Sequence, residues 1–249
     1  DGGFVADLNG ITVNNGSVNV TNYDEGGNLN IINSITTAGE NAGNVTFTSA
    51  GSINAGTIVN SAADIVMDAD GAITNDGALT AQDNVNVKTT AGAINLGGSV
   101  TAKENDVNIT TGSGTITTTG NVTSGTNVKV DAGTTGNIEL GGIVKAQAGN
   151  VDVIANEGYI HTTGDVTANN NVNVDTANGY INLEGVVNAA TGSVNVNTES
   201  GDVTTKGEVT GKTDVSINSG NGAINIGGSV TATDNDVNIT TGSGAITTI

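Results

Sequence analysis

The chain has 249 residues with 38 glycines, no proline and only 2% aromatic residues, so bulky core side chains are scarce and the composition favours short strands joined by tight turns. Six lysines, no arginine and 25 acidic residues give a net charge of −19, which disfavours binding to nucleic acid, to phosphate groups and to anionic membranes. Cysteine is absent and no apolar run is long enough for a membrane span or a signal peptide, so we expect no membrane insertion.

Residues 1–50 contain the least regular form of a repeat that continues to the end of the chain. Coil starts can be placed at Gly3 and Gly27, which gives a first coil of about twenty-four residues. The segment 22–27 between them reads as a turn or an excursion. We therefore predict irregular N-terminal coils of a single solenoid for 1–50.

Residues 51–249 contain the regular repeats. The segment 92–113 returns at 222–243 with only three changes, and looser copies fill the interval. Each coil has three pairs of apolar residues at every second position, which indicates three short strands with one buried face each. In one coil the pairs are Ile94 and Leu96, Val100 and Ala102, and Val107 and Ile109. The coils start at Gly51, Gly71, Gly92, Gly114, Gly136, Gly158, Gly179, Gly201 and Gly222.

The repeat predicts an all-β fold, a right-handed parallel β-helix (β-solenoid) with three short strands per coil of about 22 residues and about eleven coils. Right-handedness follows from the strong bias of parallel β crossovers. Coils stacked at ~4.8 Å make a rod of roughly 50 Å. A second glycine column, from Gly77 to Gly228, is expected to supply the positive φ of a corner.

The structural unit within 51–249 is predicted to be a pair of coils with a period of 43–44 residues. The residue four places after the coil start alternates between Leu or Ile and Thr, as in Leu96, Thr118 and Leu140. The turn before the third strand alternates in length in the same way, and it is longer in the coils with Leu or Ile. We infer that the bulkier side chain and the additional turn residue compensate each other in core volume.

Three segments are typical of the coils: GAINLGGSVTA (92–102), GDVTANNNVNVDT (164–176) and GSVNVNTES (192–200). Their sequences resemble the repeat region of filamentous haemagglutinin-like adhesins secreted by the two-partner route. The likeness covers nearly everything after about Gly51. It implies a bacterial protein at the cell surface or in the extracellular space, with a long right-handed β-helix and an adhesive role.

The end of the sequence bears on self-association. Residues 244–249 begin another coil without a polar cap, and unpaired parallel edges recruit further strands. We therefore expect the repeats to continue beyond residue 249 or to stack there on another copy. The expected partner is the chain itself, through end-to-end strand stacking or lateral filament contacts.

Tyr159 and Tyr180, one position after consecutive coil starts, form the most unusual outward pair, beside the ladder of Glu139, His161 and Asn182. Stacked tyrosines near a carboxylate can bind a sugar ring, so these residues are the candidate ligand site for host or neighbouring-cell glycans. A cross-coil aromatic pair that only stabilises the sheet is the simpler alternative. His161 is the only histidine, which excludes a multi-histidine metal site.

Acidic residues gather at one predicted corner of the rod. Calcium would relieve the repulsion between carboxylates on adjacent coils, although solvated turns are the simpler interpretation. The candidate calcium ligands are Asp83, Glu104, Asp106, Asp234 and Asp236. An asparagine-rich column outside the third strand, which includes Asn86, Asn108, Asn173 and Asn195, is expected to form a hydrogen-bonded ladder or to face water.

Two functions from different classes follow. The first is a structural or adhesive segment of a bacterial extracellular filament or surface adhesin, a rigid acidic rod. The second is a carbohydrate-binding β-helix module that uses Tyr159 and Tyr180. No catalytic residues are expected, because the lysines are scattered and neither a histidine-based relay nor a basic cluster beside carboxylates can be assembled.

Overall fold

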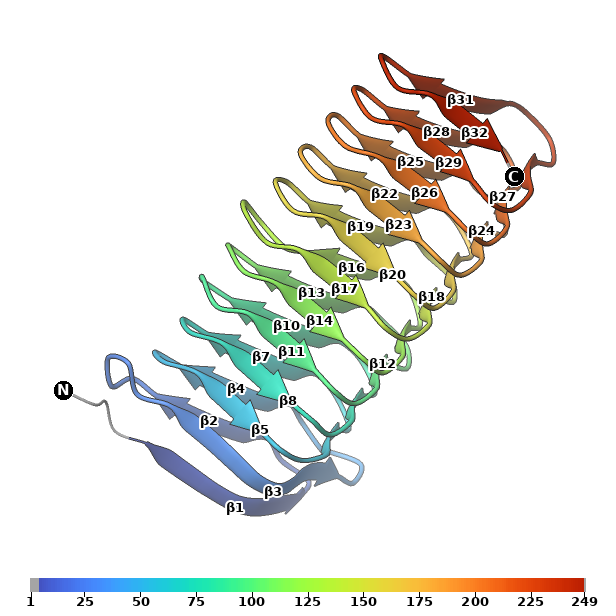
Figure 1. The fold of residues 1–249 in the computed structure, drawn as a ribbon. Helices are drawn as coiled ribbons and strands as arrows, with labels where there is room; N and C mark the ends of the chain where they lie inside the picture. The colour runs from blue at the N-terminus through green and yellow to red at the C-terminus, as the bar shows by residue number, and fades with distance from the viewer. Residues whose placement is uncertain (1–4, 249) are drawn as a thin grey trace.

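The computed structural model describes residues 5–248, in which every helix or strand element is a β-strand. The strands stack as a β-solenoid of about 11 turns of ~22 residues with three strands per coil, and the two ends of the chain lie at opposite ends of the rod (Figure 1). The predicted fold class is therefore confirmed. Residues 5–248 hold no helix that is long and apolar enough to span a membrane.

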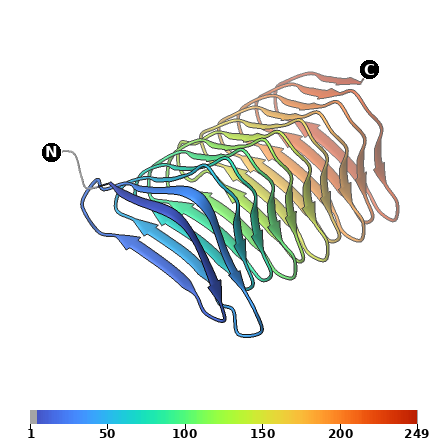
Figure 2. The ribbon, with the colours of Figure 1, turned by 90° about the horizontal axis from the view of Figure 1, so that it is seen from below.

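Each coil contributes to three faces, which Figure 2 shows from below the view of Figure 1. The first two faces share β1 (Ala6–Asn14) and β3 (Leu29–Ala38), which run through both. The rest of the first face consists of β5 (Ile53–Ala55), β8 (Ile73–Asn75), β11 (Ile94–Leu96), β14 (Ile116–Thr118), β17 (Ile138–Leu140), β20 (Ile160–Thr162), β23 (Ile181–Leu183), β26 (Val203–Thr205), β29 (Ile224–Ile226) and β32 (Ile246–Thr248).

The second and third faces complete the coil. The second face consists of β6 (Val59–Ser61), β9 (Leu79–Ala81), β12 (Val100–Ala102), β15 (Val122–Ser124), β18 (Val144–Ala146), β21 (Val166–Ala168), β24 (Val187–Ala189), β27 (Val209–Gly211) and β30 (Val230–Ala232). The third face consists of β2 (Val18–Asn22), β4 (Val45–Ser49), β7 (Ile65–Ala69), β10 (Val85–Thr89), β13 (Val107–Thr111), β16 (Val128–Asp131), β19 (Val151–Ala155), β22 (Val172–Thr176), β25 (Val194–Thr198), β28 (Val215–Ser219) and β31 (Val237–Thr241).

The core consists of columns of equivalent side chains, because each strand pairs in parallel and in register with its counterparts. Thus Ile94 of β11 lies between Ile73 and Ile116 of the neighbouring coils. Burial alternates along each strand, with every second residue inside. Burying one such side chain stabilises the fold by about 1.5–3 kcal/mol, so repeated Ile and Val columns replace a bulky aromatic core. The first column is fully buried at Ile73, Ile94, Ile116, Ile138, Ile160, Ile181, Val203 and Ile224.

The glycine column from Gly77 to Gly228 has a different cause from the predicted one. Within residues 5–248, none of its members has a positive φ, so that prediction was wrong. A Cβ at Gly142 would lie 2.5 Å from the carbonyl carbon and oxygen of Gly120 in the preceding coil, and the other members are equally close to backbone. Glycine is therefore required by the close approach of stacked corners.

The alternation of coils is present in the structure. Residues 103–106 separate β12 from β13 in a Leu coil, whereas only residues 125–127 separate β15 from β16 in the following Thr coil. The hydroxyls of Thr118, Thr162 and Thr205 are buried and have no hydrogen-bond partner in the part of the chain that the structure describes. The Thr coils thus place polar groups in the core at a cost in stability.

Candidate functional site

Tyr159 and Tyr180 precede β20 and β23, and they lie one coil apart as predicted. Their ring centroids are 4.8 Å apart and the ring planes differ by 4°, so the two rings are stacked. Each ring therefore covers one face of the other, and only the outer faces and the edges remain for a ligand. Tyr180 is the more accessible, with 46% of its surface exposed.

Glu139 binds Tyr159 directly. The Tyr159 hydroxyl donates a hydrogen bond to Oε1 of Glu139. This hydrogen bond, with burial and the nearby negative charge of Glu139, raises the pKa of Tyr159 to about 12. Glu139 also pairs in register with His161, and His161 with Asn182, so the predicted outward ladder is confirmed.

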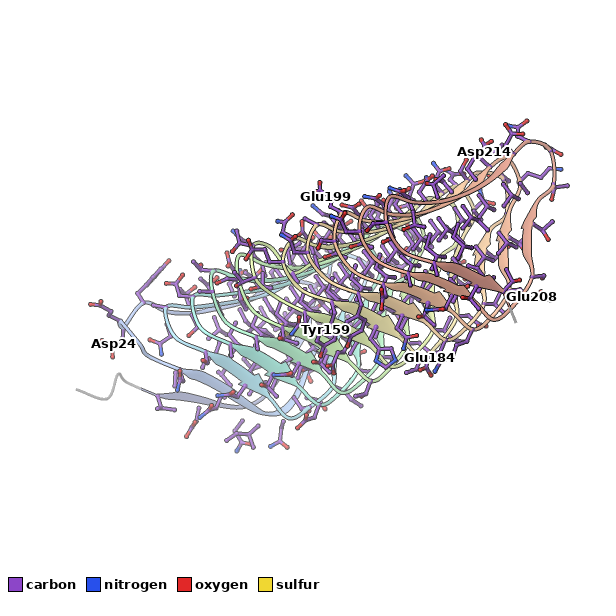
Figure 3. The ribbon with its side chains drawn as sticks, turned by 45° about the horizontal axis from the view of Figure 1, so that its top comes forward. Asp24, Tyr159, Glu184, Glu199, Glu208 and Asp214 are labelled. Carbon is purple, nitrogen blue, oxygen red and sulfur yellow. The ribbon has the colours of Figure 1, made fainter. Side chains whose placement is uncertain are left out.

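Glu184 is the centre of a second polar cluster that the sequence analysis missed. Its Oε1 lies 2.6 Å from Nζ of Lys206 and 3.3 Å from Nδ2 of Asn182. Nε2 of His161 lies 3.4 Å away without hydrogen-bond alignment, so it forms an ion pair only when the ring is protonated. The hydrogen bond from Lys206 lowers the pKa of Glu184. Figure 3 shows Tyr159 and Glu184 on the same side of the rod.

The sequence signal for this cluster is the residue that follows the Leu or Ile of each Leu coil. Glu184 follows Leu183, and the equivalent position after Leu96, Leu140 and Ile226 is glycine. A long charged side chain where the other Leu or Ile coils have glycine is a departure from the repeat, and departures from a repeat mark positions that the core does not dictate.

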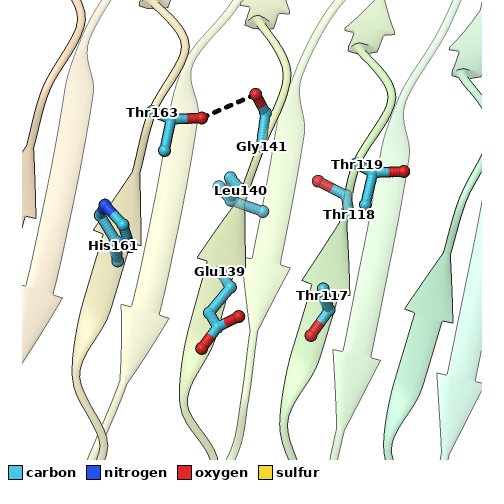
Figure 4. A pocket seen from close by; sticks show the side chains of 8 residues that line it. All are labelled: Thr117, Thr118, Thr119, Glu139, Leu140, Gly141, His161 and Thr163. Atoms are coloured by element: carbon cyan, nitrogen blue, oxygen red, sulfur yellow. Dashed lines mark hydrogen bonds between the residues drawn. The ribbon is translucent and has the colours of Figure 1, made fainter.

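Glu139 and His161 also line a surface depression of about 190 Å³ on the first face (Figure 4). Its floor is at Gly141, which has no side chain between those of Thr119 and Thr163 in the adjacent coils. The depression is lined by Thr117, Thr118, Thr119, Glu139, Leu140, Gly141, His161 and Thr163. Tyr159 and Tyr180 are not in its lining.

Asp106, a candidate calcium ligand, instead links adjacent coils. Its Oδ1 accepts hydrogen bonds from the hydroxyl of Thr126 and, at 2.9 and 3.0 Å, from the backbone N–H and side-chain amide of Asn127. Burial alone raises the pKa of Asp106, but these three hydrogen bonds outweigh it, and the net effect lowers the pKa. Asp106 belongs to a column of corner residues in which each side chain accepts a hydrogen bond from the backbone N–H of the equivalent residue in the next coil. The column runs from Asn44 through Asp64, Asn84, Asp106, Asn127, Asn150 and Asn171 to Ser193.

The other candidate calcium ligands have separate partners or positions. Glu104 accepts a hydrogen bond from Nε2 of Gln82 at 2.6 Å, and Asp234 pairs with Nζ of Lys212 at 2.9 Å. Asp83 lies between β9 and β10, and Asp236 lies in the same turn as Asp234, between β30 and β31. Within residues 5–248, no group of three or more His, Cys, Asp or Glu side chains is placed to hold a metal ion. Calcium binding stays a prediction, and no clustered donor set in the described residues supports it.

The asparagine column of the third face forms a ladder in parts. Asn108 donates to Oδ1 of Asn86 at 3.0 Å, and Asn195 donates to Oδ1 of Asn173 at 3.0 Å. Lys129 interrupts the column between these two stretches. The outer surface thus adds side-chain hydrogen bonds to the backbone ladder along the rod.

Comparison of the chain with family models, with curated proteins and with solved structures finds no match.

Proposed function

We propose that the chain is a structural and adhesive segment of a bacterial extracellular filament or surface adhesin, a rigid acidic rod at the cell surface. The observation that carries this proposal is the uninterrupted stacking of equivalent coils, each held to the next by parallel backbone bonds and by side-chain ladders. Such a rod gains length by the addition of coils without any change in its core. Length and rigidity are the properties that a filament needs.

The surface charge supports the same proposal. A net charge of −19 on 249 residues keeps a long object soluble and disfavours anionic partners. Contacts with other copies of the chain, along the sides or at the ends, extend the rod into a filament. Receptor contact in this proposal uses the outward columns, because the core columns are closed to solvent.

Electron microscopy of the purified chain at rising concentration, with and without a chelator, tests the proposal. We expect narrow straight particles of constant width. A second assay tests adhesion: beads coated with the chain should be retained on cell or glycan surfaces under flow. Compact particles of variable width, or coated beads that wash off as readily as uncoated ones, would count against it. Dissolution of fibres by the chelator would implicate calcium in assembly.

A carbohydrate-binding module is the second function, and the Tyr159–Tyr180 stack beside Glu139 is the observation that favours it. Because the rings cover each other, the outer face of Tyr180 is the surface that would take a sugar ring. The double variant Tyr159→Ala, Tyr180→Ala should lose all binding on a glycan array. Glycan binding that survives both substitutions would exclude this site.

A further inference from the structure

Four asparagines of the chain directly precede a glycine: Asn9, Asn15, Asn178 and Asn221. Such a pair can modify itself, because glycine has no side chain to hinder attack of its backbone nitrogen on the side-chain amide of the asparagine. The reaction needs an asparagine side chain that is free to turn onto that nitrogen. It also needs a glycine N–H that can lose its proton to water. The structure meets these two requirements to a different extent at the four pairs.

The asparagine side chains of the first two pairs are held by the neighbouring coil. Oδ1 of Asn9 accepts a hydrogen bond from Nδ2 of Asn33. Oδ1 of Asn15 accepts the backbone N–H of Asn41 at 3.2 Å. Each side chain must give up its hydrogen bond before it turns freely onto the following glycine, so these two pairs do not meet the first requirement.

Asn178 and Asn221 occupy equivalent positions two coils apart, and they differ in the glycine that follows. Both asparagines are exposed, and neither side chain has a hydrogen-bond partner within residues 5–248. Gly222 is buried, and its N–H donates to Oγ of Ser219 at 2.7 Å. Gly179 is half-buried, and its N–H has no partner in the part of the chain that the structure describes. A buried, hydrogen-bonded N–H loses its proton to water more slowly than a free one, so only the pair at Asn178 meets both requirements.

We propose that Asn178 is a site of spontaneous deamidation, selected by the fold from the four Asn–Gly pairs. The backbone nitrogen of Gly179 loses its proton to water and attacks Cγ of Asn178. The side-chain nitrogen takes up a proton from water and leaves as ammonia, and a cyclic succinimide remains. Water that breaks the new Cγ–N bond gives aspartate, and water that breaks the original backbone C–N bond gives isoaspartate. Water is the only reactant from outside the chain.

The stacking of the coils explains why glycine follows Asn178. A Cβ at Gly179 would lie 2.2 Å from the carbonyl oxygen of Gly158 in the preceding coil, so this corner admits no side chain. The solenoid therefore imposes the glycine for reasons of packing. A coil whose exposed preceding residue is asparagine acquires a reactive pair as a consequence.

Isoaspartate at this position would act on the aromatic pair beside it. Its backbone runs through Cβ and Cγ, which adds one atom to the main chain shortly before Tyr180. The stack of Tyr180 on Tyr159 depends on coils in register, since the ring centroids are only 4.8 Å apart. We expect the isoaspartyl chain to lose this stack and its near-ultraviolet circular dichroism. Asn178→Asp is the matched control, because it adds the same charge without the additional backbone atom and should keep the tyrosine signal.

Ageing of the intact chain in mildly alkaline buffer, followed by proteolysis and tandem mass spectrometry, tests the proposal. Water enriched in heavy oxygen marks the product that forms during ageing. We expect Asn178 to convert faster than Asn221 by about fivefold or more, because a net hydrogen bond of ordinary strength protects by roughly that factor. A free peptide with the sequence around Asn178 gives the rate without the fold.

Two variants separate the effect of the fold from that of the sequence. Ser219→Ala removes the acceptor of the Gly222 N–H, and should raise the conversion of Asn221 toward that of Asn178. Asn178→Gln lengthens the side chain, which disfavours ring closure, and should abolish conversion at this position. Unchanged far-ultraviolet circular dichroism shows that both variants fold, and the comparison of Asn178 with Asn221 in the parent chain needs neither variant.

Three outcomes would overturn the proposal. The first is an Asn178 that stays unconverted in the folded chain while the free peptide converts. The second is equal conversion at all four pairs, since the sequence and not the fold would then govern the reaction. The third is a folded Ser219→Ala chain in which Asn221 stays as slow as before, because the hydrogen bond would then not be the protecting feature.

Discussion

The corner between the first and second faces differs between the N-terminal coils and the regular coils. In both regions the first inward side chain of the second face comes six positions after that of the first face, as with Leu29 and Ile35 or Ile94 and Val100. In the N-terminal region β3 runs through the corner as one strand, whereas in the regular region β11 and β12 stop on either side of it. The same spacing therefore produces a gentle bend in one region and a sharp corner in the other.

The residue two places before the second face changes along the same part of the chain. This position is Asn33 in β3 and Thr57 in the next coil, and it is glycine from Gly77 onward. The gentle bend accommodates a side chain at Asn33, with a register shift against β1 and with Ile32 turned out to 55% exposure. Where one sharp corner stacks on another, backbone meets backbone and only glycine fits. Thr57 also lies at a sharp corner, between β5 and β6, but that corner stacks on the gentle bend of β3. Tight stacking thus depends on the glycine column.

Buried hydroxyls show the same contrast. Thr37 in the N-terminal region donates to the carbonyl of Gly43 at 2.8 Å and accepts the backbone N–H of Ala62 at 3.0 Å. The long turn 39–44 supplies that carbonyl. Ser124, at the equivalent position of the regular region, is fully buried and its hydroxyl has no partner within residues 5–248, as is also the case for Thr162 on the first face. The irregular turn 39–44 gives the buried hydroxyl of Thr37 a hydrogen-bond acceptor, and the shorter regular turn 125–127 gives the buried hydroxyl of Ser124 none.

The largest expected effect comes from Gly142→Ala. The added Cβ would meet the Gly120 backbone at 2.5 Å, so the coils must separate locally, and we expect a loss of about 3 kcal/mol in the free energy of unfolding. The matched change Asn33→Ala, in the same column of the N-terminal region, removes an exposed side chain and its exposed hydrogen bond to Asn9, and should cost less than about 0.5 kcal/mol. Urea unfolding followed by circular dichroism measures both. Equal losses would break the comparison between the two corners.

Substitution of the buried threonines should change stability in opposite directions. Thr37→Val leaves the Ala62 N–H without its partner and the Gly43 carbonyl with only the longer bond from Ser61 at 3.2 Å, and should destabilise the fold by about 1–2 kcal/mol. Thr162→Val removes an unpaired buried hydroxyl at constant shape and should stabilise the fold by about 1 kcal/mol. The same urea unfolding series tests both variants. A destabilised Thr162→Val would indicate that its hydroxyl has a bound water as partner.

The fold could be predicted because a solenoid encodes its structure locally. Each coil repeats the same period-two pattern, and in-register stacking then places Ile94 on Ile73 and Ile116 without any long-range choice. The glycine column was visible in the sequence but its cause was not. Positive φ and close backbone approach both select glycine, and only coordinates for Gly142 and its neighbour distinguish them.

The candidate site was predicted in part for the same reason. Register alone placed Tyr159 on Tyr180, since both follow coil-start glycines. Register also places Glu184 beside Lys206 in consecutive coils of one column, but the rotamers that bring their charged ends to 2.6 Å are not specified by a repeat pattern. The corner carboxylate of Asp106 was interpreted as a metal ligand because its hydrogen bonds from Thr126 and Asn127 of the next coil are invisible in a sequence.

A smaller effect on stability is expected from Asp106→Asn, and it appears only in acid. The native hydrogen bonds lower the pKa of Asp106 below the model-peptide value of 3.8, so their contribution is present above that value and is lost as the pH falls through the lowered pKa. Asparagine keeps an Oδ1 acceptor, as Asn44 does in the N-terminal rung of the same column. Urea unfolding across pH should show the variant losing less stability in acid than the parent chain. Parallel pH profiles of the two proteins would contradict this assignment.

The smallest effect concerns the ionisation of Tyr159 in the regular region. Because the fold raises the pKa of Tyr159 from 10.0 to about 12, its contribution to stability is present below pH 10 and is lost as the pH rises through about 12. Near-ultraviolet titration of tyrosinate should show one late-ionising phenol. Glu139→Gln removes the charge that holds the proton, and should move that late step to lower pH. A late step that persists in Glu139→Gln would mean that burial against Tyr180, and not the carboxylate, keeps Tyr159 neutral.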